Sequence, residues 1–335
     1  GATMQDLHSL TATEMRAALA RGETTARALT EAALNRIDAQ NPRLNAIVQR
    51  CDDQALAAAD AVDQALAKGL DAGPMAGVPV TIKANVDQAG FATTNGLRLQ
   101  ENLIAAEDNP VVANLRRAGA IIIGRTNTPA FSLRWFTRNQ VHGATINPVN
   151  PALTPGGSSG GAAAAVASGM GAIGHGTDIA GSIRYPAYAC GVHGLRPSLG
   201  RVPAFNASGP DRMIGAQLMA VSGPIARSIP DLRLALHAMA ARDIRDPWWM
   251  PAPLREPDVP RRLALCLEPE GMVVDPAIKA ALRAAAARAE AAGWQVEEVA
   301  IPPLREAVAL QLRLWLAEMR RTGGAAIYAE GDPDA

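Results

Sequence analysis

Two adjacent serines stand inside a run of glycines, TPGGSSGGAAAAVASG, at residues 154–169. A serine hydroxyl becomes a nucleophile only when a base takes its proton, so a reactive serine needs a partner. Glycines let the backbone adopt unusual φ/ψ values and let a hydroxyl approach another segment closely. The run is therefore either a flexible linker or a loop that holds a reactive hydroxyl.

The surroundings of this run argue against a linker and against a phosphate-binding loop. It leads directly into a fully apolar stretch, so it is anchored in a core, whereas linkers have polar or Pro-rich flanks. The GK[ST] ending that gives a P-loop its lysine is absent, and so is the GxGxxG spacing. The remaining interpretation is a glycine-rich loop that brings a serine hydroxyl to another segment.

Two other segments supply groups for such chemistry. Ser182 follows the small-residue turn 179–181 in GTDIAGSIRYPAYACG, and consecutive backbone N–H groups in such a turn stabilise a developing oxyanion. Lys83 ends an alternating, strand-like segment, and a lysine acts as a base once it is neutral. Lowering its pKa from about 10.4 to near 7 disfavours the charged form by roughly 4–5 kcal/mol, which burial can supply. Taken alone, such a lysine is usually a surface cation and such a serine a turn residue.

Longer motifs around these residues resemble the amidase signature family of serine hydrolases. The resemblance rests on GVPVTIKANVDQAG around Lys83, GRTNTPAF at 124–131, the PGGSSGG run, and GTDIAGSIRYPAYACGVHGLRPSLGRVP at 176–203. The motifs occur in the family's order and extend from about residue 70 to about residue 240. The resemblance implies an α/β fold with a central, mixed but mostly parallel twisted sheet and helices on both faces.

The resemblance also implies a role for each matching residue. Lys83 corresponds to the family's base, Ser158 to its bridging serine with a cis peptide bond, and Ser182 to its nucleophile. Ser159 would be structural. The oxyanion hole would consist of the backbone N–H groups of Ile179, Ala180, Gly181 and Ser182.

Three further residues in these motifs have less direct roles. For Asp178 and Arg184 we expect an ion pair that braces the nucleophile turn rather than contact with substrate. Ser132 follows TNTPAF and either lines the substrate entrance or is an ordinary loop serine.

The sequence departs from the family pattern at two motif positions. Ala84 stands where an acid commonly follows the lysine, and Ala180 stands where glycine is common. Alanine keeps the backbone N–H but resists a positive φ, so we expect any change in the oxyanion hole to arise at position 180. The chain is also shorter than family members usually are, and we expect it to lack the C-terminal part of the family fold.

The function predicted on this basis is a metal-independent amidase of bacterial type, which converts a carboxylic amide to an acid and ammonia or an amine. Two alternatives stay open. One is the glutaminase (A-type) component of a tRNA-dependent amidotransferase, although its usual turn, resembling SDTGGSIRQP, differs from GTDIAGSIRYP. The other is a catalytically silent scaffold or binding module, because the chain looks truncated.

Composition excludes other classes of protein. The 32 Lys and Arg residues balance 32 Asp and Glu residues without a run of like charge, so we expect no direct binding of nucleic acid. The three cysteines, Cys51, Cys190 and Cys266, are widely separated, which predicts reduced thiols. The five histidines lack HxxxH and HxH spacing, so we expect no metal site. We also expect no cofactor.

The first residues, GATMQDLHSL, do not resemble a targeting segment, which predicts a cytoplasmic protein without membrane contact. We expect residues 1–3 to be a cloning remnant. The expected partner is a small-molecule amide, and a homodimer is possible.

Alternating helices and strands must position the reactive groups. We expect a helical segment over residues 4–70, joined in one domain to an α/β core at 71–335. Thr11 and Glu14 predict a capping box, and the next helix is expected to stop at Asn41-Pro42. Further helices are predicted at 53–67, 110–118, 161–167 and 276–292, and strands at 78–83, 120–124, 263–267 and 294–301.

Overall fold

The computed structural model describes residues 6–255 and 259–335, so the expected cloning remnant lies outside the described residues. The chain divides into two compact units, one made of Gly1–Ala252 with Gly324–Ala335 and the other of Pro253–Gly323, and each is described by itself. Our expectation of a single domain from residue 4 to residue 335 stays a prediction.

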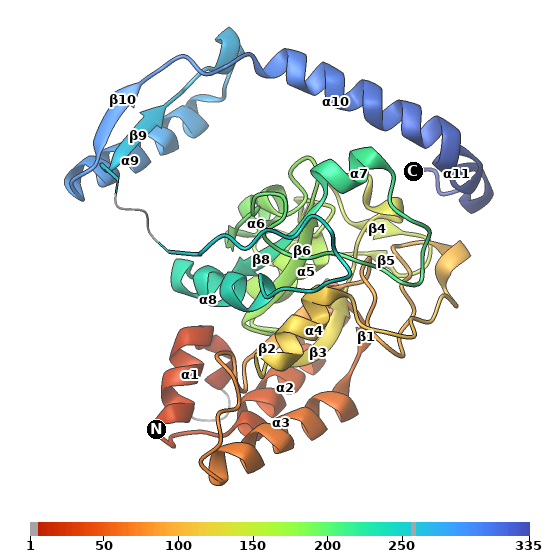
Figure 1. Cartoon of the computed structure of the whole chain (residues 1–335), viewed down its shortest axis with the longest axis vertical. Coiled ribbons are helices and arrows are strands. Elements are labelled where there is room, and N and C mark those ends of the chain that lie inside the picture. Colours follow the sequence, from red (N-terminus) through yellow and green to blue (C-terminus); the bar gives the residue numbers. More distant parts are fainter. Residues whose placement is uncertain (1–5, 256–258) are drawn as a thin grey trace. The chain divides into compact units, whose positions relative to one another are not determined.

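A six-stranded mixed sheet runs through the first unit (Figure 1). Strands β3, β2 and β6 are parallel neighbours at its centre, while β1 pairs antiparallel at one edge and β8 and β7 follow antiparallel at the other. Strands β2, β3, β6 and β7 thus run in one direction, which confirms the predicted mixed, mostly parallel sheet. The strand bounds, in sheet order, are Ile47–Arg50 (β1), Ile121–Thr126 (β3), Pro79–Lys83 (β2), Ile173–Asp178 (β6), Val221–Ala226 (β8) and His193–Gly194 (β7).

The central strands are buried on both faces, as their continuous apolar sequences predict. In β3, Ile122 packs into one core cluster and its neighbours Ile121 and Ile123 into the other. Helices α1, α4 and α8 contribute to the first cluster, and α3 and α5 to the second, so helices cover both faces. The helix bounds are Ala12–Ala20 (α1), Ala26–Leu44 (α2), Asp52–Ala67 (α3), Pro110–Arg117 (α4), Gly160–Ala167 (α5), Arg184–Cys190 (α6), Ile214–Met219 (α7), Ile229–Met239 (α8) and Gly324–Glu330 (α11).

The N-terminal helices confirm one expectation and correct another. The capping box forms at α1, where the Thr11 hydroxyl accepts from the Glu14 N–H and the Glu14 carboxylate accepts from the Thr11 N–H. Helix α2 continues through Pro42 and ends at Leu44, so the predicted stop at Asn41-Pro42 is wrong. Asn45, which adopts a left-handed conformation, ends the helix and donates its N–H to the Asn41 carbonyl.

The second unit is built around a βαβ element. Strands β9 (Arg262–Leu265) and β10 (Gln295–Glu298) pair in parallel, and α9 (Pro276–Ala291) connects them. The Asp275 side chain accepts the Ala277 N–H and caps α9, as the sequence predicts. Helix α10 (Leu304–Glu318) and a π-helical turn follow.

The remaining regular elements are short. A two-stranded ribbon joins β4 (Arg138–Asn139) to β5 (Gly143–Ala144), and the 3-10 helices are Leu7–Ser9, Arg98–Gln100, Ala130–Ser132 and Pro269–Gly271. The three cysteines are free thiols, as predicted. Among the helices that the structure describes, none has the length and apolar character needed to cross a membrane.

Candidate active site

Lys83 is the last residue of β2, and its side chain is fully buried. Its Nζ lies 2.7 Å from Ser158 Oγ, 2.8 Å from Thr177 Oγ1 and 3.0 Å from Ser159 Oγ. Burial lowers the pKa of Lys83 to about 7, although the negative charge of Asp178 acts in the opposite direction. A large fraction of this lysine is therefore a neutral amine at physiological pH.

The two serines of the glycine-rich run come from the loop that leads into α5. The Gly157–Ser158 peptide bond is cis, and both serine side chains are buried. The Ser159 hydroxyl donates to the Thr177 carbonyl and accepts from the Thr177 N–H, each at 3.2 Å. Ser159 is thus tied to the backbone of β6, but it also contacts the lysine amine, which its expected structural role did not include.

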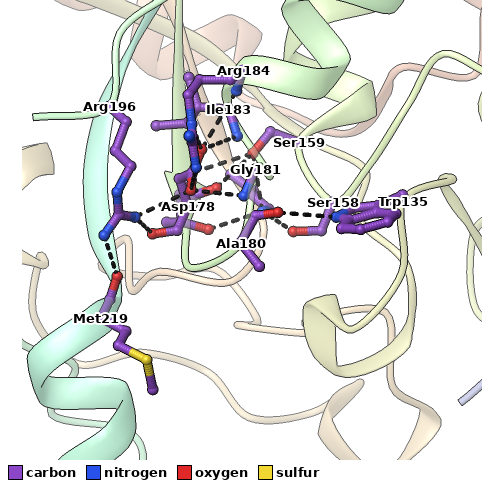
Figure 2. A network of polar contacts seen from close by, with 12 residues as sticks. Trp135, Ser158, Ser159, Asp178, Ala180, Gly181, Ile183, Arg184, Arg196 and Met219 are labelled. Carbon is purple, nitrogen blue, oxygen red and sulfur yellow. Dashed lines mark hydrogen bonds and ion pairs between the residues drawn. The ribbon is translucent and has the colours of Figure 1, made fainter. Parts of the chain in front are cut away.

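The turn that carries Ser182, the expected nucleophile, begins where β6 ends, at Asp178; we call it the nucleophile turn. The buried Asp178 carboxylate accepts N–H groups from Gly181 at 2.9 Å and Ile183 at 3.1 Å (Figure 2). It also forms ion pairs with Arg184 at 3.0 Å and with Arg196 at 3.1 Å. Burial works to raise the pKa of Asp178, but the hydrogen bonds from Arg184 and from the two backbone N–H groups outweigh it and hold the pKa at about 2.

The expected oxyanion donors differ in their availability. The Gly181 N–H is engaged by Asp178, whereas within the described part of the chain the N–H groups of Ile179, Ala180 and Ser182 have no hydrogen-bond acceptor. The positive φ of the turn, +113°, falls on Gly181, and Ala180 is not among the described non-glycine residues with positive φ. Ala180 therefore does not have to adopt a positive φ, because the residue with positive φ is the next one along the chain.

Ser182 lies beside the serine loop. Its carbonyl accepts the Ser159 N–H at 3.1 Å, and its side chain is half-buried. Within the described residues, no hydrogen bond joins the Ser182 hydroxyl to that of Ser158. The structure thus brings Lys83 and Ser158 into direct contact and ties Ser182 to the same loop through the backbone.

Comparisons with known proteins show the family of this chain. The family model Amidase matches residues 28–327. The chain belongs to the amidase signature family. It is 50% identical over 296 residues to an indoleacetamide hydrolase of Bradyrhizobium diazoefficiens, and this match covers 88% of the chain and 56% of that protein.

Two further relatives show the range of this family. The A-type component of a glutamyl-tRNA(Gln) amidotransferase from Synechococcus sp. (strain WH7803) is 38% identical over 306 residues, which is 88% of the chain and 61% of that protein. A solved bacterial aryl acylamidase of the amidase signature enzymes has a TM-score of 0.85 and 28% identity, over 97% of this chain and 68% of that one. The chain therefore spans little more than half the length of the curated relatives that it matches.

The side chain of Ser132 contacts residues of its own loop and of a neighbouring loop. Its hydroxyl donates to Asn95 Oδ1 at 2.7 Å and lies 2.8 Å from Thr128 Oγ1. Ser132 and the preceding Phe131 both have positive φ, at 56° and 58°. These contacts favour the interpretation as a loop-bracing serine over a place at the substrate entrance.

Several residues of the site were missed by the sequence reasoning, although most stand in the motifs already quoted. Thr177 precedes Asp178, contacts the lysine and accepts from Asn85 Nδ2 at 2.9 Å. Arg196 shares Asp178 with Arg184. Position within a motif was the available signal, but the partners of these side chains follow only from the fold.

His175 is a fully buried histidine in β6 behind the lysine. Its Nδ1 accepts the Lys83 backbone N–H at 3.3 Å, and its Nε2 lies 2.9 Å from Ser222 Oγ. Burial, with the charges of Lys83 and Arg125, lowers the pKa of His175 to about 3. The histidine is therefore neutral, and its hydrogen bonds connect β2, β6 and β8.

Within residues 6–255 and 259–335, no group of three or more His, Cys, Asp or Glu side chains could hold a metal ion.

Proposed function

We propose that this chain carries the catalytic centre of a metal-independent amidase that forms an acyl-enzyme on Ser182. The buried contact between Lys83 Nζ and Ser158 Oγ carries the proposal. It pairs an amine that is partly neutral near pH 7 with a hydroxyl whose proton the amine can accept. Membership of the amidase signature family supports the same chemistry.

The hydrogen bonds around the lysine support Ser158, rather than Ser159, as the serine that passes the proton. A neutral amine has two N–H donors and one lone pair, and it faces three hydroxyl groups. Ser159 gives its own proton to the Thr177 carbonyl, so toward the amine it can only accept. Ser158 has no other partner among the described residues, and its proton is free to point at the lone pair. We therefore assign the relay to Ser158.

Acylation then follows in one sequence of bond changes. The Ser182 hydroxyl first has to form a hydrogen bond to Ser158 Oγ. Ser182 Oγ then attacks the amide carbonyl carbon while its proton passes through Ser158 to Lys83 Nζ. The carbonyl oxygen becomes negative and is stabilised by the N–H groups of Ile179, Ala180 and Ser182. The carbon–nitrogen bond breaks as Lys83 returns the proton, through Ser158, to the departing nitrogen. Ammonia or an amine leaves, and the acyl group remains on Ser182 as an ester.

Deacylation repeats these steps with water as the nucleophile. Lys83 and Ser158 take a proton from the water as its oxygen attacks the ester carbonyl. The bond to Ser182 Oγ breaks, Oγ recovers a proton, and the carboxylic acid leaves. The sum is one amide and one water converted to one acid and one amine.

For the acyl group we propose an arylacetyl amide, with indole-3-acetamide as the first compound to test. The indoleacetamide hydrolase is 50% identical to the chain, against 38% for the amidotransferase component, which favours an arylacetamide over glutamine. A cytoplasmic location and a homodimer stay predictions of the sequence.

The test uses a fluorophosphonate, which reacts with activated serines, followed by intact-mass analysis and peptide mapping. We expect one adduct, on Ser182, in the unaltered chain and none in Ser182→Ala. We also expect hydrolysis of indole-3-acetamide that EDTA does not reduce. A folded chain that neither reacts nor hydrolyses amides would overturn the proposal and leave a silent scaffold. Release of glutamate from glutamine alone would favour the amidotransferase alternative, and zinc-dependent recovery after EDTA would refute metal independence.

A further inference from the structure

The segment 134–137 contacts the loop that carries Ser158. A Cβ built on Gly157 would lie 2.4 Å from the Phe136 carbonyl oxygen and 2.6 Å from that of Arg134, so only glycine permits this approach. Thr137 Oγ1 donates to the Gly156 carbonyl at 2.9 Å. The backbone of this segment therefore lies directly against the residues that precede the proposed relay serine.

The same segment reaches the nucleophile turn through one side chain. Trp135 Nε1–H donates to the Ala180 carbonyl at 3.2 Å (Figure 2). The N–H at the other end of that peptide group belongs to Gly181 and donates to Asp178 Oδ1 at 2.9 Å. The 180–181 peptide group is thus held from both sides, by a tryptophan and by a buried carboxylate.

This peptide group lies between two proposed oxyanion donors. The N–H of Ala180 belongs to the preceding peptide group, and the N–H of Ser182 to the following one. The central group shares ψ of residue 180 and φ of residue 181 with its neighbours, so a fixed central group restrains the dihedral angles that set the directions of both donors. The hydrogen bond from Trp135 to the Ala180 carbonyl therefore helps to fix the direction of these two N–H groups.

Two features hold Trp135 in position although the residue is 61% exposed. Its ring meets that of Tyr185 edge to face, with centroids 6.3 Å apart, and the Tyr185 N–H donates to the Gly181 carbonyl at 2.8 Å. Upstream, Phe131 and Ser132 have positive φ, which non-glycine residues keep only where contacts enforce it. The hydrogen bond from Ser132 Oγ to Asn95 Oδ1 supplies such a contact.

We propose that Trp135 is a positioning residue for the oxyanion hole, acting through the Ala180 carbonyl. The proposal rests on the proposed function, because it needs Ser182 to be the nucleophile. A residue of this kind contributes to the transition state, in which the oxyanion exists, and not to binding of the ground-state amide. A tryptophan that only formed a wall of the substrate site would have the opposite signature.

The test removes the indole N–H and keeps an aromatic ring, in Trp135→Phe and in a chain with 3-benzothienylalanine at position 135. Trp249→Phe is the matched control, because Trp249 Nε1 donates to the Ala240 carbonyl at 2.9 Å outside the site. For both changes at 135 we expect a fall of roughly 3- to 10-fold in kcat, the effect of one neutral hydrogen bond, with KM within 2-fold. The control keeps both constants.

Inhibitor binding separates positioning from substrate contact. Affinity for an arylboronic acid, which forms a tetrahedral anion on the serine, is expected to fall by the same factor as kcat. Affinity for the product carboxylate is expected to stay unchanged. A raised KM with unchanged kcat would show a substrate wall and overturn the inference.

A readout independent of turnover is hydrogen exchange of the peptide that covers 178–185. We expect faster exchange there in Trp135→Phe and unchanged exchange in Trp249→Phe. If Ser182 is labelled by the fluorophosphonate at the original rate in Trp135→Phe, and exchange in the turn is unchanged, this inference fails while the proposed function stands. If Ser182 is not labelled in the unaltered chain, the proposed function itself fails.

Discussion

Lys83 Nζ lies 2.7 Å from Ser158 Oγ, although the two residues are 75 positions apart in the chain. The lysine ends a central strand, and the serine belongs to the loop before α5, so only the folded sheet brings them together. Both side chains are buried, which makes the contact strong and the charged form of the lysine costly.

This burial predicts the pH dependence of the reaction. The pKa of Lys83 is lowered to about 7, and the proposed base works only when neutral, so kcat/KM should rise with pH through 7 and level off above it. Below that pKa each pH unit should cost about tenfold. The profile of kcat/KM between pH 5 and 9 measures this, with Lys83→Met as the inactive reference. A profile that is flat across this range would exclude Lys83 as the base.

The two neighbouring serines should differ in their effect on the rate. Ser158→Ala removes the hydroxyl assigned to the relay and should lower kcat by at least 100-fold. Ser159→Ala removes a contact to Lys83 and two to Thr177, so we expect a smaller loss, of about tenfold or less. The rate of fluorophosphonate labelling at Ser182 should follow the same order. Equal losses in the two variants would contradict the assignment.

The sequence predicts the features of the fold that depend on residues close together in the chain better than those that depend on contacts between distant residues. The strand ending at Lys83, the α1 capping box and the start of α9 follow from local patterns, and all three are confirmed. The predicted end of α2 was wrong, because Asn45 and not Pro42 terminates the helix.

In the candidate site, too, the sequence identified the motifs but not the contacts between distant residues. The motifs identified Lys83 and the serine loop, but not that Ser159 and Thr177 also contact the lysine. From the sequence we expected any change in the oxyanion hole to arise at Ala180, and the structure puts the positive φ on Gly181. Contacts between side chains from different segments depend on strand register and loop path, which periodicity does not specify.

Asp178 should make the free energy of unfolding depend on pH in the acid range. Its pKa is lowered from 3.8 to about 2, so the folded state favours the charged carboxylate. The stabilisation, about 2 kcal/mol, is complete above pH 4 and is lost as pH falls from 4 to 2. Urea unfolding at pH 2 to 5 should show this loss in the unaltered chain and not in Asp178→Asn. The variant should also be less stable at pH 7, because Arg184 and Arg196 lose their partner.

Asp334 offers a control for the acid prediction. It forms an ion pair with Arg138 at 2.6 Å, but the arginine side chain is 57% exposed. Solvent screens such a surface pair, so Asp334→Asn should change the free energy of unfolding little. A loss equal to that of Asp178→Asn would show that burial is not the cause.

Replacing Gly181 by alanine should be unfavourable even though there is space for the added methyl group. The nearest atom to a Cβ at this position is Trp135 Nε1 at 3.9 Å, so space is available, but φ is +113°. Alanine avoids this region, and the turn should relax and shift the N–H of Ser182. We expect Gly181→Ala to lower kcat by at least tenfold, with a loss of stability of about 1–3 kcal/mol.

Gly191→Ala is the matched control for this last prediction. Gly191 ends α6 with φ +70° and has no atom within 4 Å of a Cβ, so alanine there meets backbone strain alone. It should lower the unfolding free energy by about 1 kcal/mol and leave kcat unchanged. Unfolding and kinetics measured on both variants separate strain in general from strain in the turn. If kcat falls equally in both, the geometry of the nucleophile turn is not what Gly181 maintains.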